Sequence, residues 1–212
     1  RYPLTTQMRV RAGADYVAFV RALLRGEVTS GSRPDLGDYE LRLFDDLGAM
    51  QREILQRNAA DGLARLVAGY AWEWKSNTNK DAFDIELDGV RLRWNSTTKD
   101  WINSRASIDE VGSIHTVQGY DLNYAGVIIG PDLRFDADTG RLFIDRESYR
   151  DKKGKENNKQ LGIVYSDEDL LAFIRNIYGV LLTRGMRGTF VYVCDPALRA
   201  YVASVIGPVD RV

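Results

Sequence analysis

The stretch AGVIIG at residues 125–130 is an apolar run that ends just before a proline. Such a run is typical of a parallel strand that is buried on both faces of a sheet. Residues 189–194, TFVYVC, have the same character, and residues 63–71 contain a shorter apolar run. Residues 39–44 alternate between apolar and polar side chains, which indicates a further strand. These four segments predict the strands of one sheet.

Helical patterns separate the predicted strands. Residues 14–24 and residues 47–60 carry apolar side chains at helical spacing. Ser166 is placed to cap a third helix, and Pro196 is placed at the start of a fourth. Strands that alternate with helices predict an α/β fold with a mostly parallel sheet.

The 212 residues are expected to form one domain, because a domain typically holds about 100–200 residues. The sequence begins at Arg1 without a methionine, so we expect a fragment of a longer protein. Residues 134–144 predict a hairpin. The polar, lysine-rich residues 146–160 predict a mobile charged loop, with a loop that contacts phosphates as the alternative.

The composition excludes several classes of protein. Lys and Arg number 29 and Asp and Glu number 30, which argues against a protein that coats nucleic acid through bulk electrostatics. Any nucleic-acid contact is therefore expected in a local groove. The single cysteine, Cys194, excludes an internal disulfide and a Cys-rich zinc module, and it favours a cytoplasmic protein. No apolar run approaches the ~18–20 residues of a membrane span, so no membrane partner is expected.

All four tryptophans lie within residues 72–101, which we expect to form a β-rich insertion. Residues 84–87 and 90–94, separated by an Asp-Gly pair, predict a hairpin. One interpretation is that the tryptophans hold together a small satellite core. The other is that Trp72 and Trp94, interleaved with basic residues, stack on the bases of a single strand.

Known enzyme templates are mostly absent. With His115 as the only histidine, the chain has no HExxH motif and no histidine-rich metal cluster, so no metal site is expected. It also has no G-x-S-x-G, no G-x-x-x-x-G-K-[ST] and no G-x-G-x-x-G. The chain alone therefore has no recognisable device for holding a triphosphate.

Three short segments point to one family. They read LTTQMR at residues 4–9, SIHTVQGYD at residues 113–121 and YGVLLTRG at residues 178–185. In this order the segments resemble the motifs of the second RecA-like half of superfamily-one helicases. The nearest resemblance is to the Schlafen-type DNA/RNA helicase domain of bacterial proteins, and it covers essentially the whole chain.

The resemblance implies a RecA-like lobe of a P-loop NTPase that lacks the Walker A lobe. The full-length protein would then be an ATP hydrolase of the helicase or translocase class. ATP and Mg²⁺ would bind mainly to an N-terminal RecA-like lobe of the same protein, and the present chain alone would be inactive. By the same resemblance Arg184 is the arginine finger and Arg9 is a second γ-phosphate sensor, a role that suits the rigid, charged guanidinium. A surface salt bridge is the alternative for Arg184.

The other matched positions receive roles in the same way. Gln7, Gln118, Gly119 and Asp121 would contact the nucleotide, and Asp121 stands where many relatives carry Glu, which leaves its ribose or water contact open. The last three would also link the nucleotide state to the nucleic-acid track.

His115 and Thr116 would face the backbone of a DNA or RNA strand, most simply a single strand. A structural role is the alternative for His115. Two other functions remain open: a signalling or defence ATPase that switches without unwinding a duplex, and a non-catalytic nucleic-acid-binding module.

Overall fold

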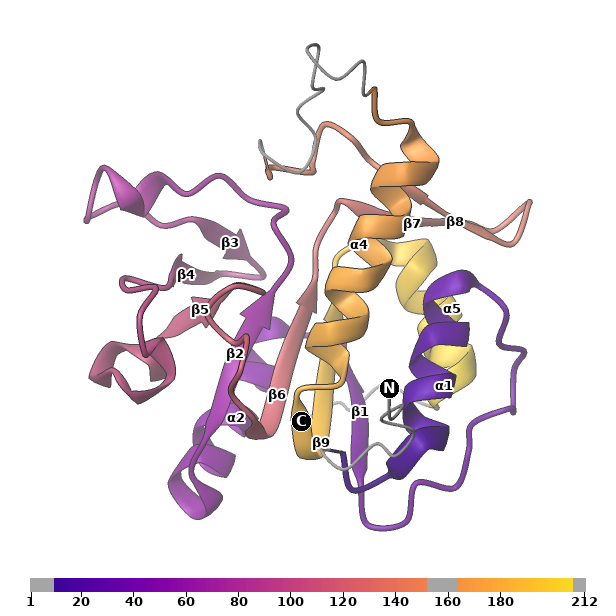
Figure 1. Cartoon of the computed structure of the whole chain (residues 1–212), viewed down its shortest axis with the longest axis horizontal. Coiled ribbons are helices and arrows are strands. Elements are labelled where there is room, and N and C mark those ends of the chain that lie inside the picture. Colours follow the sequence, from indigo (N-terminus) through magenta and orange to yellow (C-terminus); the bar gives the residue numbers. More distant parts are fainter. Residues whose placement is uncertain (1–9, 152–163, 208–212) are drawn as a thin grey trace, which may run out of the picture.

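The computed structural model describes residues 10–151 and 164–207. Its main sheet has seven strands in the order β1-β9-β6-β2-β5-β4-β3 (Figure 1). Starting from the edge strand β1, the strands are β1 (Glu40–Phe44), β9 (Gly185–Val193), β6 (Leu122–Ile129), β2 (Ala64–Ala68), β5 (Glu110–Gly112), β4 (Val90–Trp94) and β3 (Ile85–Leu87). All neighbours are parallel except β3 and β4. The predicted α/β class with a mostly parallel sheet is confirmed.

Helices cover both faces of the sheet (Figure 1). One face carries α1 (Gly13–Arg25), α4 (Asp167–Leu182) and α5 (Pro196–Ile206), and the other carries α2 (Leu47–Asp61). In β6, Val127 and Ile129 join the core under the three helices, whereas Ile128 joins the core under α2. The strand is thus buried on both faces, as its apolar run predicts.

The helices begin and end at residues whose chemistry accounts for the boundary. Ser166 forms a capping box with Asp169 at the start of α4, and Asp195 caps α5 ahead of Pro196. Gly26 ends α1 with a φ of 75°, a left-handed conformation that glycine adopts without strain.

The remaining elements are short. The predicted hairpin is present as β7 (Leu133–Asp136) and β8 (Arg141–Ile144), a separate two-stranded sheet beside α4 and α5. The described ranges also contain the 3₁₀ helices η1 (Lys75–Asn77), η2 (Trp101–Asn103) and η3 (Arg105–Ile108). No helix in the described ranges is both long enough and apolar enough to span a bilayer.

The tryptophan-rich stretch, residues 72–101, extends the main sheet. Its hairpin, β3 and β4, pairs through β4 with β5, and β5 pairs with β2. Trp101 and Trp94 are buried, and the carboxylate of Asp84 accepts hydrogen bonds from the backbone N–H groups of Ser76 and Trp94. The stretch therefore differs from a self-contained insertion, because its strands share the hydrogen-bond ladder and the core of the main sheet.

Candidate nucleotide and nucleic-acid site

Two of the three motif segments meet where two central strands of the sheet, β6 and β9, begin. Parallel strands β6 and β9 are neighbours, and their register pairs Leu122 with Gly185. Asp121 and Arg184 therefore immediately precede paired positions at the start of two adjacent strands.

The turn of residues 113–121, which we call the connecting turn, leads from β5 to β6. Thr116 holds its first half together, because its hydroxyl donates to the carbonyl of Ser113 at 2.9 Å and accepts from the N–H of Ser113 at 2.9 Å. Val117 anchors the middle of the turn in the core. Gln118 and Gly119 follow at the exposed tip.

The tip has a conformation that its sequence favours. Gly119 has a φ of 89°, a value that a side chain would strain. Next to it, the hydroxyl of Tyr120 donates to the carboxylate of Asp100 at 2.9 Å, which ties the turn to the start of η2. The tip thus has an exposed backbone at Gly119, and the hydrogen bond from Tyr120 to Asp100 holds it in place.

Arg184 lies against this tip. Its Nη1 donates to the carbonyl of Tyr120 at 3.3 Å, and its own carbonyl accepts from the N–H of Leu122 at 3.2 Å. Only 7% of Arg184 is exposed. The guanidinium is thus held by the connecting turn, away from bulk solvent.

The first motif segment, residues 4–9, lies outside the described residues, so Gln7 and Arg9 have no described position. The chain becomes described at Val10, which is buried. The N–H of Arg11 donates to the carbonyl of Met186 at 3.0 Å, two residues beyond Arg184.

An aromatic cluster lies at the other end of the connecting turn. The ring of His115 is 5.8 Å from that of Tyr70, which is 5.9 Å from that of Trp94. The rings of Trp94 and Trp72 are 6.3 Å apart. A cavity of about 490 Å³ adjoins the cluster, and Trp74 and Arg150 also line it. His115 is exposed, Trp72 is half-buried and Trp94 is buried.

Residues 1–195 match the model of Schlafen group 3, DNA/RNA helicase domain. The chain belongs to this family. An uncharacterized protein of Saccharomyces cerevisiae is 33% identical over 215 residues, which cover 93% of the chain and 46% of the yeast protein. The chain thus spans about half the length of this relative. This relative is fungal, whereas the sequence motifs led us to expect bacterial proteins.

Two residues of this Schlafen group 3 domain face differently from the expectation. Thr116 and Trp94 are each 2% exposed, so neither presents its side chain to a strand outside the domain. The hydroxyl of Thr116 is occupied by Ser113, and the ring of Trp94 forms part of the core shared with α2. Trp94 is therefore a core residue whose ring packs against Tyr70 and Trp72.

The sequence patterns did not single out Tyr70, Trp74 or Arg150. Tyr70 follows β2, and the ends of parallel strands in α/β sheets are places where ligands bind. The position of Tyr70 just after a predicted strand could therefore have pointed to a site, but only once β2 was known to lie beside β5 and near the connecting turn. Within residues 10–151 and 164–207, no group of three His, Cys, Asp or Glu side chains is placed to hold a metal ion.

Proposed function

We propose that this domain is the C-terminal RecA-like lobe of a nucleic-acid-dependent ATPase of the helicase or translocase class. In this proposal Arg184, with Arg9, completes an ATP and Mg²⁺ site whose main part belongs to an N-terminal RecA-like lobe of the same protein. The observation that carries the proposal is the hydrogen bond from Arg184 to the carbonyl of Tyr120. It joins two motif segments that lie more than sixty residues apart in the chain.

The chemistry favours an arginine at this position. Hydrolysis of a bound triphosphate builds negative charge on the transferred phosphoryl oxygens, and a guanidinium placed there stabilises that charge. Arg184 is largely removed from water, which strengthens its interaction with an anion. The exposed backbone of Gly119 allows a close approach of the nucleotide beside it.

The connecting turn offers a physical link to nucleic acid. One end contacts Arg184 through Tyr120, and the other contacts the aromatic cluster through His115. Val117 and Thr116 are buried between the two ends, so the middle of the turn is packed against the core. A shift of its tip when a nucleotide binds would therefore reach the face where a single DNA or RNA strand would stack on Trp72.

The test is the Arg184→Ala variant of a protein that contains both lobes, with ATP turnover measured with and without a single-stranded oligonucleotide. We expect turnover to fall about a thousandfold or more, the range known for arginine fingers. Arg184→Lys should restore little, because an ammonium does not reproduce the planar fork.

Arg187→Ala is the matched control. Arg187 lies three residues away and pairs with Asp61 at the end of α2, so turnover should stay close to that of the unaltered protein. Equal turnover in the Arg184→Ala variant and the unaltered protein would reject the assigned role. Hydrolysis without strand displacement would assign the protein to the switch class.

A further inference from the structure

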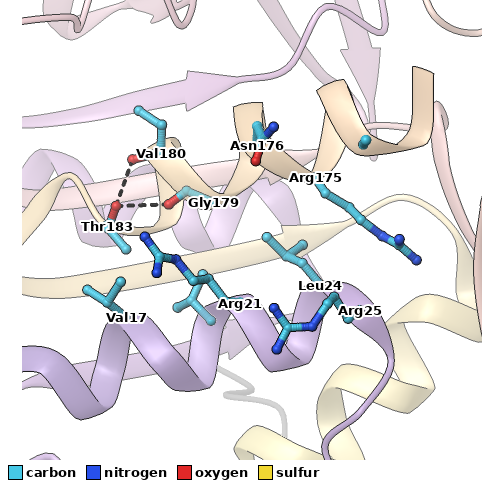
Figure 2. A pocket seen from close by; sticks show the side chains of 11 residues that line it. Val17, Arg21, Leu24, Arg25, Arg175, Asn176, Gly179, Val180 and Thr183 are labelled. Atoms are coloured by element: carbon cyan, nitrogen blue, oxygen red, sulfur yellow. Dashed lines mark hydrogen bonds between the residues drawn. The ribbon is translucent and has the colours of Figure 1, made fainter. Parts of the chain in front are cut away.

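A groove runs between α1 and α4, on the face of the sheet opposite α2 (Figure 2). It has a volume of about 560 Å³. Its floor includes the aliphatic side chains of Val17, Leu24 and Val180. Among the described residues, the charged side chains that line it are three arginines, namely Arg21, Arg25 and Arg175. The groove is therefore apolar along its base and positive along its rim.

The positive charge of the rim is poorly balanced. Arg25 pairs with Glu27 at 2.7 Å, and Glu27 also acts on Arg175 at longer range, but among the described residues neither Arg21 nor Arg175 forms an ion pair in direct contact. The Nε of Arg175 is buried, with no hydrogen-bond acceptor in the described part of the chain. Burial lowers the pKa of the Arg175 guanidinium; Glu27 opposes this effect and Arg25 adds to it. An anionic ligand would offset the cost of holding these charges together.

Gly179 gives an independent indication that something approaches this groove. It lies inside α4, where glycine is less favourable than alanine. A Cβ at this position would meet the Cδ1 of Leu24 at 3.7 Å, which is an ordinary van der Waals contact. Packing within the described chain therefore does not require a glycine here. Gly179 lines the groove, where the missing side chain leaves room for a closely packed ligand.

We propose that the groove between α1 and α4 binds an acidic amphipathic helix of a partner protein. Aliphatic side chains of that helix would pack on the floor, and its Asp and Glu residues would pair with Arg21 and Arg175. This arrangement is the helix-in-groove mode of recognition. Figure 2 shows Arg21 on the side of Thr183 and Arg175 toward the other end, so the pairing sites are spread along the groove.

The lining favours a peptide over a nucleic acid. None of the described residues that line the groove is aromatic, so a base would find no ring there on which to stack. The aliphatic floor instead matches the leucine-rich face of an amphipathic helix.

A labelled peptide of about 18 residues, with leucines at helical spacing between glutamates, is a suitable probe. Fluorescence anisotropy with the full chain should show saturable binding. The Arg21→Glu/Arg175→Glu double variant should weaken that binding at least about tenfold, because both substitutions place a carboxylate opposite the glutamates of the peptide. Arg91→Glu/Arg141→Glu, which changes the net charge equally at exposed sites outside the groove, should leave it nearly unchanged.

A second variant tests the groove without changing its charge. Gly179→Phe should fill the groove and weaken the peptide about as much, and Gly179→Ala should weaken it to a smaller extent, because a single methyl group takes up only part of the room that the glycine leaves. Circular dichroism and thermal unfolding would show that each variant is folded. Equal affinity for a peptide with lysines in place of glutamates, or equal losses in the two double-charge variants, would overturn the proposal. So would a single-stranded oligonucleotide that displaces the peptide and depends on Arg21 and Arg175.

Discussion

Arg184 and Asp132 lie at opposite ends of the central strands, and both are almost fully buried. Guanidinium groups in general stay protonated at ordinary pH values, because they are too basic to lose the proton. Asp132 differs, because burial raises the pKa of its carboxyl to about 6, with a smaller contribution from Asp145. The hydroxyl of Tyr178 donates to Asp132 at 2.7 Å and opposes that rise. The charge of the buried Asp132 carboxyl therefore depends on pH in the range around 6.

This difference predicts how stability depends on pH. Because the carboxyl of Asp132 has a higher pKa in the folded protein than in the unfolded chain, the folded state binds the proton more tightly. The stabilisation that comes from this tighter proton binding is complete below about pH 4 and is lost as the pH rises through 6. The free energy of unfolding falls by about 3 kcal/mol over this range. Asp132→Asn should remove this loss, as measured by urea unfolding between pH 4.5 and 7.5. Asp138→Asn, at an exposed turn, is the control and should keep it. Parallel pH profiles for Asp132→Asn and the unaltered chain would contradict this assignment.

At the scale of elements, the aromatic cluster combines residues from the segment after β2, from β4 and from the connecting turn. Trp72→Ala should weaken binding of a single-stranded oligonucleotide about tenfold or more, because one stacked base contributes roughly 1–3 kcal/mol. His115→Ala should weaken it further in the double variant. Phe143→Ala removes another exposed aromatic side chain, in β8, and should not change the affinity. Anisotropy titrations at fixed salt would measure the three values, and equal affinities for all would exclude the cluster as the binding face.

Local patterns in the sequence predicted the long helices, the strands β1, β2, β6 and β9, and the two hairpins, because each of these segments carries its own apolar pattern or turn signal. β5 has only three residues, too few for a pattern, and its place in the sheet depends on pairing with β2 and β4. The burial of Thr116 has a similar cause, since the motif does not reveal that its hydroxyl bonds to the backbone of Ser113. The pairing of Leu122 with Gly185, which places Arg184 beside the connecting turn, follows from tertiary structure alone.

At the scale of the whole molecule, the domain places a charged residue, Arg184, immediately before the central strand β9. The affinity of P-loop NTPases for ATP comes largely from backbone N–H groups, a lysine and Mg²⁺ ligands, which the G-x-x-x-x-G-K-[ST] motif brings together. The sequence has no such motif. We therefore predict that this chain alone neither binds ATP tightly nor hydrolyses it, and that both properties require the N-terminal lobe.

Phosphate release with Mg²⁺ and a single-stranded oligonucleotide measures this prediction, with Arg184→Ala as the matched control. For the chain alone we expect both samples to give the same background rate, because Arg184 has no bound phosphoryl group to act on. In a protein with both lobes the two rates should separate. Mg²⁺-dependent turnover by the chain alone, above that of Arg184→Ala, would show that the domain holds a complete site. Arg184 would then act within a single lobe, and closure of two lobes would no longer be needed for hydrolysis.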